Sequence, residues 1–222
     1  MNADPFEEPR SQMIAVIAAE TVFLTGELGK AALDRKVLEV MSRVPRHEFV
    51  PVELRGYAYV NSPLPIGCDK TISQPFIVAL MTDLLELQPT DRVLEIGTGL
   101  GYQAAILSQL AHKVYSVEFI EELAAQAKKR LAAQGCSNIE LRLGNGFHGW
   151  PEHAPFDKII VTAGTDLVPP PLLYQLKPGG RMIIPTGLPD SQKLVLVEKD
   201  ANGRTKAREF LRVRFSLLEG TA

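Results

Sequence analysis

The stretch VLEIGTGLGYQAAILS (Val93–Ser108) joins a short apolar run to a helical pattern through a turn rich in glycine. The run RVLEIG (residues 92–97) has the length and the β-branched content of a buried strand, whereas YQAAILSQLA (residues 102–111) is typical of a helix. Glycine lets the chain turn tightly between the two elements. Strand, turn and helix in this order are the repeating unit of an open, largely parallel sheet.

The same alternation continues to the end of the chain. Short, nearly continuous apolar strands between helices predict a parallel sheet covered on both faces. The linker DANGRT (residues 200–205) is only a turn, so the last two strands are expected to pair antiparallel. Further strands are expected over residues 113–118, 138–144, 157–164, 180–187, 193–200 and 208–219, and helices over residues 75–87, 120–135 and 171–176. We therefore predict an α/β fold with a doubly wound, mostly parallel, seven-stranded sheet, in a single domain spanning residues 1–222.

Residues 1–70 are expected to form a helical and looped N-terminal extension packed on this domain. MIAVIAAETVFL (residues 13–24) reads as one mostly buried helix, and DRKVLEVMSRV (residues 34–44) carries an apolar stripe. Prolines and glycines at intervals through residues 45–67 argue against regular structure there. A connection of that length suggests a functional loop or a covering flap.

Composition indicates a well-packed globular protein. Of 222 residues 45% are hydrophobic, and the formal net charge of −2, with no basic stretch, argues against nucleic acid as a partner. No apolar run reaches the roughly 18 residues of a membrane span, and the N-terminus lacks a secretory signal. Cys68 and Cys136 lie far apart and read as free thiols, so we expect a cytoplasmic protein without membrane contacts, a monomer or weak oligomer. His148 and His153 have few acidic neighbours, so no metal site is expected.

Gly97, Gly99 and Gly101 stand at alternate positions in the first strand-to-helix turn, where ligands of such folds bind. Their G-x-G-x-G spacing is neither a dinucleotide fingerprint nor a P-loop, which favours a ligand without a pyrophosphate. Glu118 ends the next strand, where its carboxylate can accept hydrogen bonds from both hydroxyls of a ribose. Taken singly, the glycines could be a tight turn and Glu118 a solvated acid; together they favour a nucleoside-type ligand.

The pattern E-x-G-x-G-x-G with a downstream acid resembles the S-adenosylmethionine site of class I methyltransferases. After the third strand that family commonly has an Asp that accepts a hydrogen bond from the adenine amino group. Asn145 stands here instead and keeps one acceptor oxygen. Judged from its neighbours alone, Asn145 could equally belong to a plain turn.

The resemblance extends over about residues 10–216, and within class I methyltransferases it is specific to one family. VPRHEFVP, KTISQPFIVALM, GNGFHGWPEHAPFDKIIVTA and QLKPGGRMIIPTG occur in the order found in protein-L-isoaspartate O-methyltransferases. TISQP is the most specific piece, because other class I methyltransferases lack it. The resemblance implies a Rossmann-like class I methyltransferase that transfers methyl from S-adenosylmethionine to the α-carboxylate of L-isoaspartyl residues in damaged proteins and peptides. The resulting ester collapses to a succinimide, which initiates repair.

The resemblance also implies the site residues. Ser73, the serine of TIS, is the expected catalytic residue and is also expected to contact the acceptor. The cofactor-binding residues implied are Thr71, Ile72, Gly97, Thr98, Gly99, Gly101, Glu118, Asn145 and Gly146. The further substrate-binding residues implied are Pro65, Ile66 and Thr162.

Three points stay open from the sequence. Without the family, Ser73 reads as the N-cap of the helix that begins at Pro75. Asp69 and Lys70 replace a Gly-Gln pair usual in the family, and Lys70 either contacts an acidic substrate or, as we favour, is solvated. The loop NSPLPIG (residues 61–67) is hypothesised to cover an extended peptide and bind its backbone.

Two other functions are compatible with these residues. The chain could methylate another carboxylate or a small molecule, since Lys70 and Asn145 depart from the family pattern. It could also be a non-catalytic module that binds the cofactor or damaged peptides. The intact glycine turn, Glu118 and Ser73 favour the enzyme.

Overall fold

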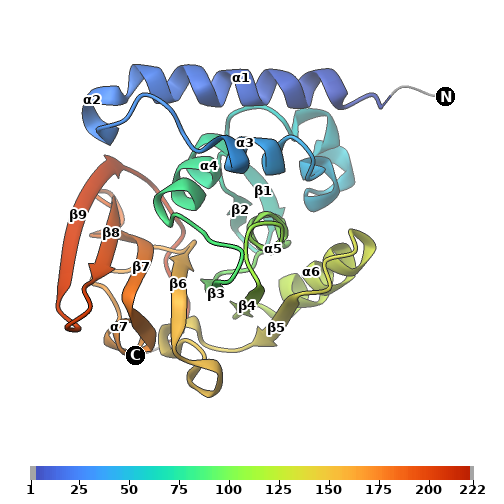
Figure 1. Cartoon of the computed structure of the whole chain (residues 1–222). Coiled ribbons are helices and arrows are strands. Elements are labelled where there is room, and N and C mark those ends of the chain that lie inside the picture. The colour runs from blue at the N-terminus through green and yellow to red at the C-terminus, as the bar shows by residue number, and fades with distance from the viewer. Residues whose placement is uncertain (1–3, 221–222) are drawn as a thin grey trace.

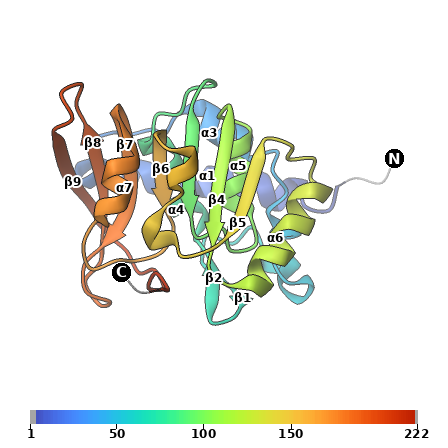
Figure 2. The same ribbon diagram turned by 90° about the horizontal axis from the view of Figure 1, so that it is seen from below.

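A computed structural model describes residues 4–220 and places seven strands in one sheet, in the order β5-β4-β3-β6-β7-β8-β9 (Figures 1 and 2). The first five of these are parallel, and β8 pairs antiparallel with β7 and with β9. The strands are β3 (Arg92–Ile96), β4 (Lys113–Glu118), β5 (Ile139–Leu143), β6 (Phe156–Val161), β7 (Leu176–Thr186), β8 (Lys193–Lys199) and β9 (Thr205–Arg212). The predicted doubly wound, mostly parallel sheet is confirmed, including its antiparallel last pair.

Helices cover both faces of the sheet. They are α1 (Glu7–Phe23), α2 (Thr25–Leu28), α3 (Arg35–Met41), α4 (Pro75–Leu84), α5 (Tyr102–Ser108), α6 (Glu121–Ala133) and α7 (Pro170–Gln175). The residues at the starts of two of them explain where these helices begin. Asp34 caps α3 by accepting a hydrogen bond from the Lys36 N–H at 2.8 Å. Pro75 opens α4 at a position where its missing N–H costs nothing.

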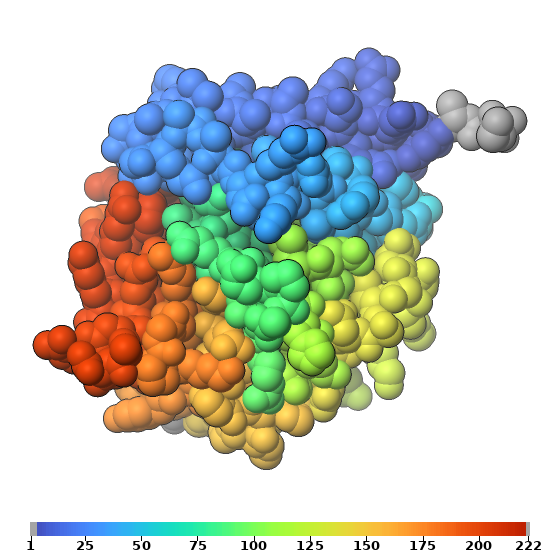
Figure 3. Space-filling model, viewed as in Figure 1, coloured from blue at the N-terminus to red at the C-terminus, as the bar shows by residue number. Residues whose placement is uncertain are grey.

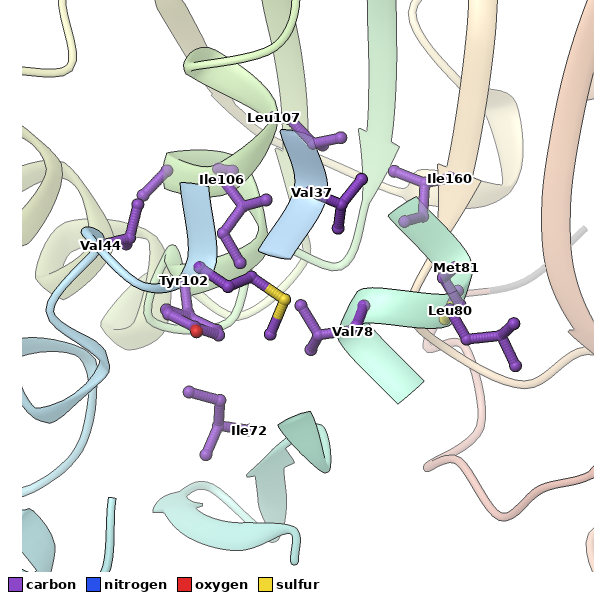
Figure 4. Packing of buried hydrophobic residues seen from close by; sticks show 14 of the residues in the cluster. Val37, Val44, Ile72, Val78, Leu80, Met81, Tyr102, Ile106, Leu107 and Ile160 are labelled. Atoms are coloured by element: carbon purple, nitrogen blue, oxygen red, sulfur yellow. The ribbon is translucent and has the colours of Figure 1, made fainter. Parts of the chain in front are cut away.

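Alternating side chains of the strands build two cores. Val93 faces the core shared with α1, α3, α4 and α5, whereas Leu94 faces the core shared with α7, because successive strand residues point to opposite faces. Ile159 and Ile160 alternate in the same way. Figure 4 shows the first core, where side chains of α3, α4 and α5 meet Ile160. Burial on both faces explains why these strands read as continuous apolar runs.

The N-terminal helix lies more on the surface than its sequence suggests. α1 begins at Glu7 and spans one side of the molecule, in contact with α4 (Figures 1 and 3). Only Met13, Ile17 and Thr21 are buried, whereas Phe23 is 86% exposed. The expectation of a mostly buried helix over residues 13–24 was wrong, because α1 packs through one stripe. No helix among residues 4–220 is long and apolar enough to cross a lipid bilayer.

The connection before α4 is more regular than predicted. Two 3₁₀ helices, η1 (Arg46–Phe49) and η2 (Val52–Tyr57), each follow a proline that occupies the N-cap position. β1 (Leu64–Gly67) then pairs antiparallel with β2 (Lys70–Ile72) to form a hairpin. The proline-rich segment therefore does fold into short elements, since proline is well tolerated at helix starts and in edge strands.

The two largest differences from the expected strand boundaries are in β7 and β9. β7 begins at Leu176, four residues earlier than predicted, and its pairing with β6 carries an irregularity between Phe156 and Lys158. The last strand was expected to run to Glu219, but β9 ends at Arg212. Residues 213–219 leave the sheet and turn toward the ends of the parallel strands.

Candidate active site

A cavity of about 480 Å³ opens at the carboxyl ends of β3, β4 and β6. Parallel register brings these ends to one edge, since Ile96 pairs with Val117 of β4 and with Val161 of β6. The turn after β3, the hairpin β1–β2, the start of α4 and residues 212–219 complete its walls. This is the edge at which ligands bind in doubly wound sheets.

The glycine-rich turn forms the floor of this cavity. Gly97 has a φ of 93° and Gly99 a φ of 57°, values that favour glycine. A Cβ on Gly97 would lie 2.6 Å from the Thr162 Oγ1. That hydroxyl donates to the Gly97 carbonyl at 2.6 Å and ties the turn to the end of β6. The turn is therefore fixed in shape and open to a close backbone contact with a ligand.

Glu118 holds the turn from the opposite side. Its Oε2 accepts a hydrogen bond from the Gly99 N–H at 2.7 Å. Its Oε1 accepts from the N–H groups of Phe119 and Ile120 at 2.9 and 3.0 Å. The side chain is buried at the end of β4 and lines the cavity. Three backbone donors thus fix a carboxylate where a polar ligand group can reach it.

A second acid lies beneath the turn. Glu95 is fully buried; Thr98 donates to Ser116 at 2.6 Å, and Ser116 in turn donates to a carboxylate oxygen of Glu95. Burial raises the pKa of Glu95 to about 8, the Ser116 hydrogen bond opposes this rise, and the charge on Glu118 adds to it. Glu95 is therefore protonated at neutral pH, and it supports the turn as a neutral group.

Ser73 lies between β2 and α4 and lines the cavity. The N-cap residue of α4 is Gln74, whose side chain makes no capping hydrogen bond. Asn61 instead accepts from the Phe76 N–H in the first turn at 2.9 Å, so the interpretation of Ser73 as a cap was wrong. Within residues 4–220 the Ser73 hydroxyl makes no hydrogen bond, whereas its carbonyl accepts one from Arg46 at 2.7 Å. The hydroxyl is thus available to a ligand in the cavity.

Most of the other predicted site residues converge on the same cavity. Those that line it are Ile66, Thr71, Ile72, Gly97, Thr98, Gly99, Glu118, Gly146 and Thr162. Pro65, Gly101 and Asn145 lie outside its walls. Gly101 is the N-cap of α5 and faces Leu131, and the Asn145 side chain accepts a hydrogen bond from the Phe147 N–H at 2.9 Å. The binding roles of all the predicted site residues stay predictions.

Residues 212–219 form a wall that the sequence did not indicate. Gly164 and this segment exchange backbone hydrogen bonds at 2.8 Å, through Ser216 and Leu218. The buried Gln192 holds the segment from behind by accepting from the Phe215 N–H at 2.6 Å and donating to its carbonyl at 3.1 Å. Local pattern could not reveal this, because the residues read as the continuation of a strand.

Lys70 is not a freely solvated side chain. Its ammonium pairs with the Glu219 carboxylate, and both residues line the cavity. The Lys70 side chain is only 23% exposed. The ion pair therefore joins the hairpin to the C-terminal segment across the cavity, which corrects the expectation that Lys70 is solvated.

A doubly wound sheet with a glycine turn after its first parallel strand and an acid ending the next is a nucleoside-binding arrangement, and the family match identifies it as that of a class I S-adenosylmethionine-dependent methyltransferase. The profile of the protein-L-isoaspartate(D-aspartate) O-methyltransferase family matches residues 23–221. The chain belongs to this family.

Individual relatives agree with this assignment. A protein-L-isoaspartate O-methyltransferase 1 of Polaromonas sp. is 64% identical over 99% of this chain and 93% of its own. A protein-L-isoaspartate O-methyltransferase 2 of Syntrophobacter fumaroxidans is 56% identical over 98% of this chain and 88% of its own. A solved protein-L-isoaspartate O-methyltransferase superposes with a TM-score of 0.81 at 30% identity, over 95% of this chain and 66% of that one. A Plasmodium falciparum structure in complex with S-adenosyl-L-homocysteine, at 20% identity and a TM-score of 0.79, shares the fold.

Proposed function

We propose that this protein transfers the methyl group of S-adenosylmethionine to the α-carboxylate of L-isoaspartyl residues in damaged proteins, and that Ser73 orients the acceptor. The observation that carries the proposal is that Ser73 and the Gly97–Gly99 turn line one cavity. A group that can hold an acceptor thus stands near the turn that can hold a nucleoside. Family membership supplies the chemistry of both partners.

The cavity suits a nucleoside cofactor. Gly99 leaves its backbone open on the cavity side, where a Cβ would come within 3.3 Å of Ile66. Glu118 offers carboxylate oxygens at the end of β4, the position from which an acid contacts a ribose. When bound, S-adenosylmethionine supplies an electrophilic methyl group on a sulfonium centre. Thr71, Ile72, Thr98 and Gly146 complete the proposed cofactor site, to which we also assign Gly101 and Asn145 as supports.

The acceptor needs orientation more than activation. A carboxylate with a pKa near 4 is already ionised at neutral pH, so no general base is required. Holding two reactants in line can lower a barrier by roughly 7–11 kcal/mol. Ser73 donates one neutral hydrogen bond, which orients the carboxylate without over-stabilising its charge in the ground state. Ile66 and Thr162 are proposed to contact the acceptor, and Pro65 to contact the peptide outside the cavity.

The partners and the cellular compartment that we propose follow from this reaction. We infer that the partners are damaged proteins, met in the cytoplasm by a monomer or weak oligomer. Cys68 and Cys136 are both free thiols, which suits a reducing compartment.

The proposal is tested with two peptides of identical sequence, one containing L-isoaspartate and the other L-aspartate. Each is incubated with enzyme and S-adenosylmethionine labelled on the methyl group, and base-labile label on the peptide is counted. The proposal requires label on the isoaspartyl peptide only. Equal label on both peptides would refute isoaspartyl specificity. Label on neither, with S-adenosyl-L-homocysteine still bound, would indicate a different acceptor.

A further inference from the structure

Arg46 is a buried cation without an anionic partner. Its side chain is fully buried in η1, beneath the loop that precedes the hairpin β1–β2. No carboxylate among residues 4–220 pairs with it. Burial lowers the pKa of Arg46 to about 10, so the guanidinium stays charged at neutral pH. Burying an unpaired charge is costly, which calls for a function that a neutral side chain could not serve.

The guanidinium joins two segments that lie far apart in sequence. Its Nε donates to the Ala58 carbonyl at 2.8 Å, and its Nη2 donates to the Ser73 carbonyl at 2.7 Å. Ala58 is the C-cap of η2, and Ser73 lies in the turn between β2 and α4. A planar fork of donors can satisfy two carbonyls at once in a fixed geometry, which lysine cannot do.

The face of the same guanidinium lies against the cofactor side of the site. Its central carbon is 4.8 Å from the centroid of the Tyr102 ring. Tyr102 is the first residue of α5, directly after the glycine turn, and it lines the cavity. Ser73 and Tyr102 thus approach the cavity from two walls, and Arg46 touches both from behind.

We propose that Arg46 is a positioning residue that fixes the Ser73 turn relative to the cofactor-binding helix α5, and that it acts on methyl transfer through Ser73. The inference rests on the proposed role of Ser73. It goes further in assigning the accuracy of acceptor placement to a buried guanidinium that contacts neither reactant.

Arg46→Lys tests the fork, because it keeps the charge and loses the paired hydrogen bonds. We expect kcat with the isoaspartyl peptide to fall at least tenfold, while the Kd for S-adenosyl-L-homocysteine stays within about threefold of wild type. Arg130→Lys is the matched control. Arg130 donates to the carbonyls of Glu48 and Val50 at the other end of η1, away from the Ser73 turn. This control is expected to lose thermal stability and to keep its kcat. Equal losses of kcat in the two variants would overturn the proposal.

A double-mutant cycle with Ser73→Ala separates positioning from general support. If Arg46 acts through Ser73, Arg46→Lys costs much less in kcat in the Ser73→Ala background than in wild type. If the factors by which the two single substitutions lower kcat multiply in the double variant, Arg46 acts independently of Ser73. Wild-type turnover and Ser73→Ala alone test the proposed function, so its failure is distinguishable from failure of this inference.

A measurement on the wild-type protein covers the case in which Arg46→Lys does not fold. The Nε–H of Arg46 is observed by ¹⁵N NMR with S-adenosyl-L-homocysteine bound, before and after isoaspartyl peptide is added. If the Arg46 guanidinium holds the Ser73 turn, we expect this signal to shift when the isoaspartyl peptide is added and not when the aspartyl peptide is added. An unchanged signal at saturating isoaspartyl peptide would overturn the proposal.

Discussion

The Glu118 carboxylate accepts a hydrogen bond from the Gly99 backbone N–H at 2.7 Å, and this contact fixes the glycine turn to the end of β4. Two further backbone donors, Phe119 and Ile120, occupy the other oxygen. A carboxylate offers about four lone-pair positions. Three of these positions are occupied, so contact with both hydroxyls of a ribose requires Glu118 to release one of its backbone donors.

Replacing Glu118 removes both the anchor of the turn and the proposed ribose contact. We expect Glu118→Ala to weaken S-adenosyl-L-homocysteine binding by roughly 1.5–3 kcal/mol, or about 10- to 150-fold in Kd, as measured by calorimetry. Glu121→Ala, in the first turn of α6, is the matched control and should bind normally. Unchanged binding by Glu118→Ala would exclude the ribose role.

Ser73→Ala should lower turnover and leave the folded state intact. Because the Ser73 side chain does not cap α4, we expect a large loss of kcat with an unchanged melting temperature and near-normal cofactor affinity. Asp34→Ala provides the contrast, since Asp34 does cap α3. It should cost about 0.5–2 kcal/mol of stability and keep its kcat. If Ser73→Ala lowers only the melting temperature, the proposed role of Ser73 is wrong.

Glu95 should make stability depend on pH in a defined window. Its folded-state pKa of about 8 lies above the ordinary value of 4.5, so the folded state holds a proton that the unfolded state releases. This contribution is fully present below the lower pKa and is lost as the pH rises through the upper one. Relative to Glu95→Gln, which does not titrate, wild type should lose unfolding free energy up to about pH 8 and then level off.

Urea unfolding of wild type and Glu95→Gln between about pH 6 and pH 9 measures this difference. The glutamine is also expected to keep cofactor binding near neutral pH, because it replaces a neutral side chain. A difference that is constant with pH would mean that Glu95 is ionised in the folded protein.

Gly97→Ala should close the cofactor turn. The added Cβ would meet the Thr162 Oγ1 at 2.6 Å, at a φ of 93° that alanine rarely adopts. We expect at least a tenfold loss of S-adenosyl-L-homocysteine affinity, together with a lower melting temperature. Gly135→Ala is the control that separates backbone strain from a steric clash with Thr162. Gly135 also has a positive φ, of 69°, but nothing lies within 4 Å of a Cβ added there. This control should cost about 1–2 kcal/mol of stability and bind normally. Equal affinity losses would argue against a specific role for the turn.

The sheet could be predicted because its signal is local. Val93–Ile96 and the other central strands are buried on both faces, so each is a short apolar run bounded by glycines or polar residues. The glycine turn and Glu118 could also be found, since their roles depend on residue types at fixed distances from strand ends.

The missed features depend on unusual backbone conformations or on contacts between distant segments. The hairpin β1–β2 turns at Cys68 and Asp69, whose φ values of 51° and 53° are uncommon for residues other than glycine. Residues 213–219 leave the sheet because Gly164 and Gln192 bind their backbone from elsewhere in the chain. The pairing of Lys70 with Glu219 follows from that path and has no trace in either local sequence.

In the proposed reaction the α-carboxylate of an isoaspartyl residue is the methyl acceptor. The most direct test compares an isoaspartyl peptide with its analogue in which that carboxylate alone is a carboxamide. Methyl incorporation from labelled S-adenosylmethionine is measured for both, with the modified residue located by mass spectrometry. We expect a methyl ester on the isoaspartyl α-carboxylate and no incorporation into the carboxamide. Equal methylation of the two peptides would contradict it.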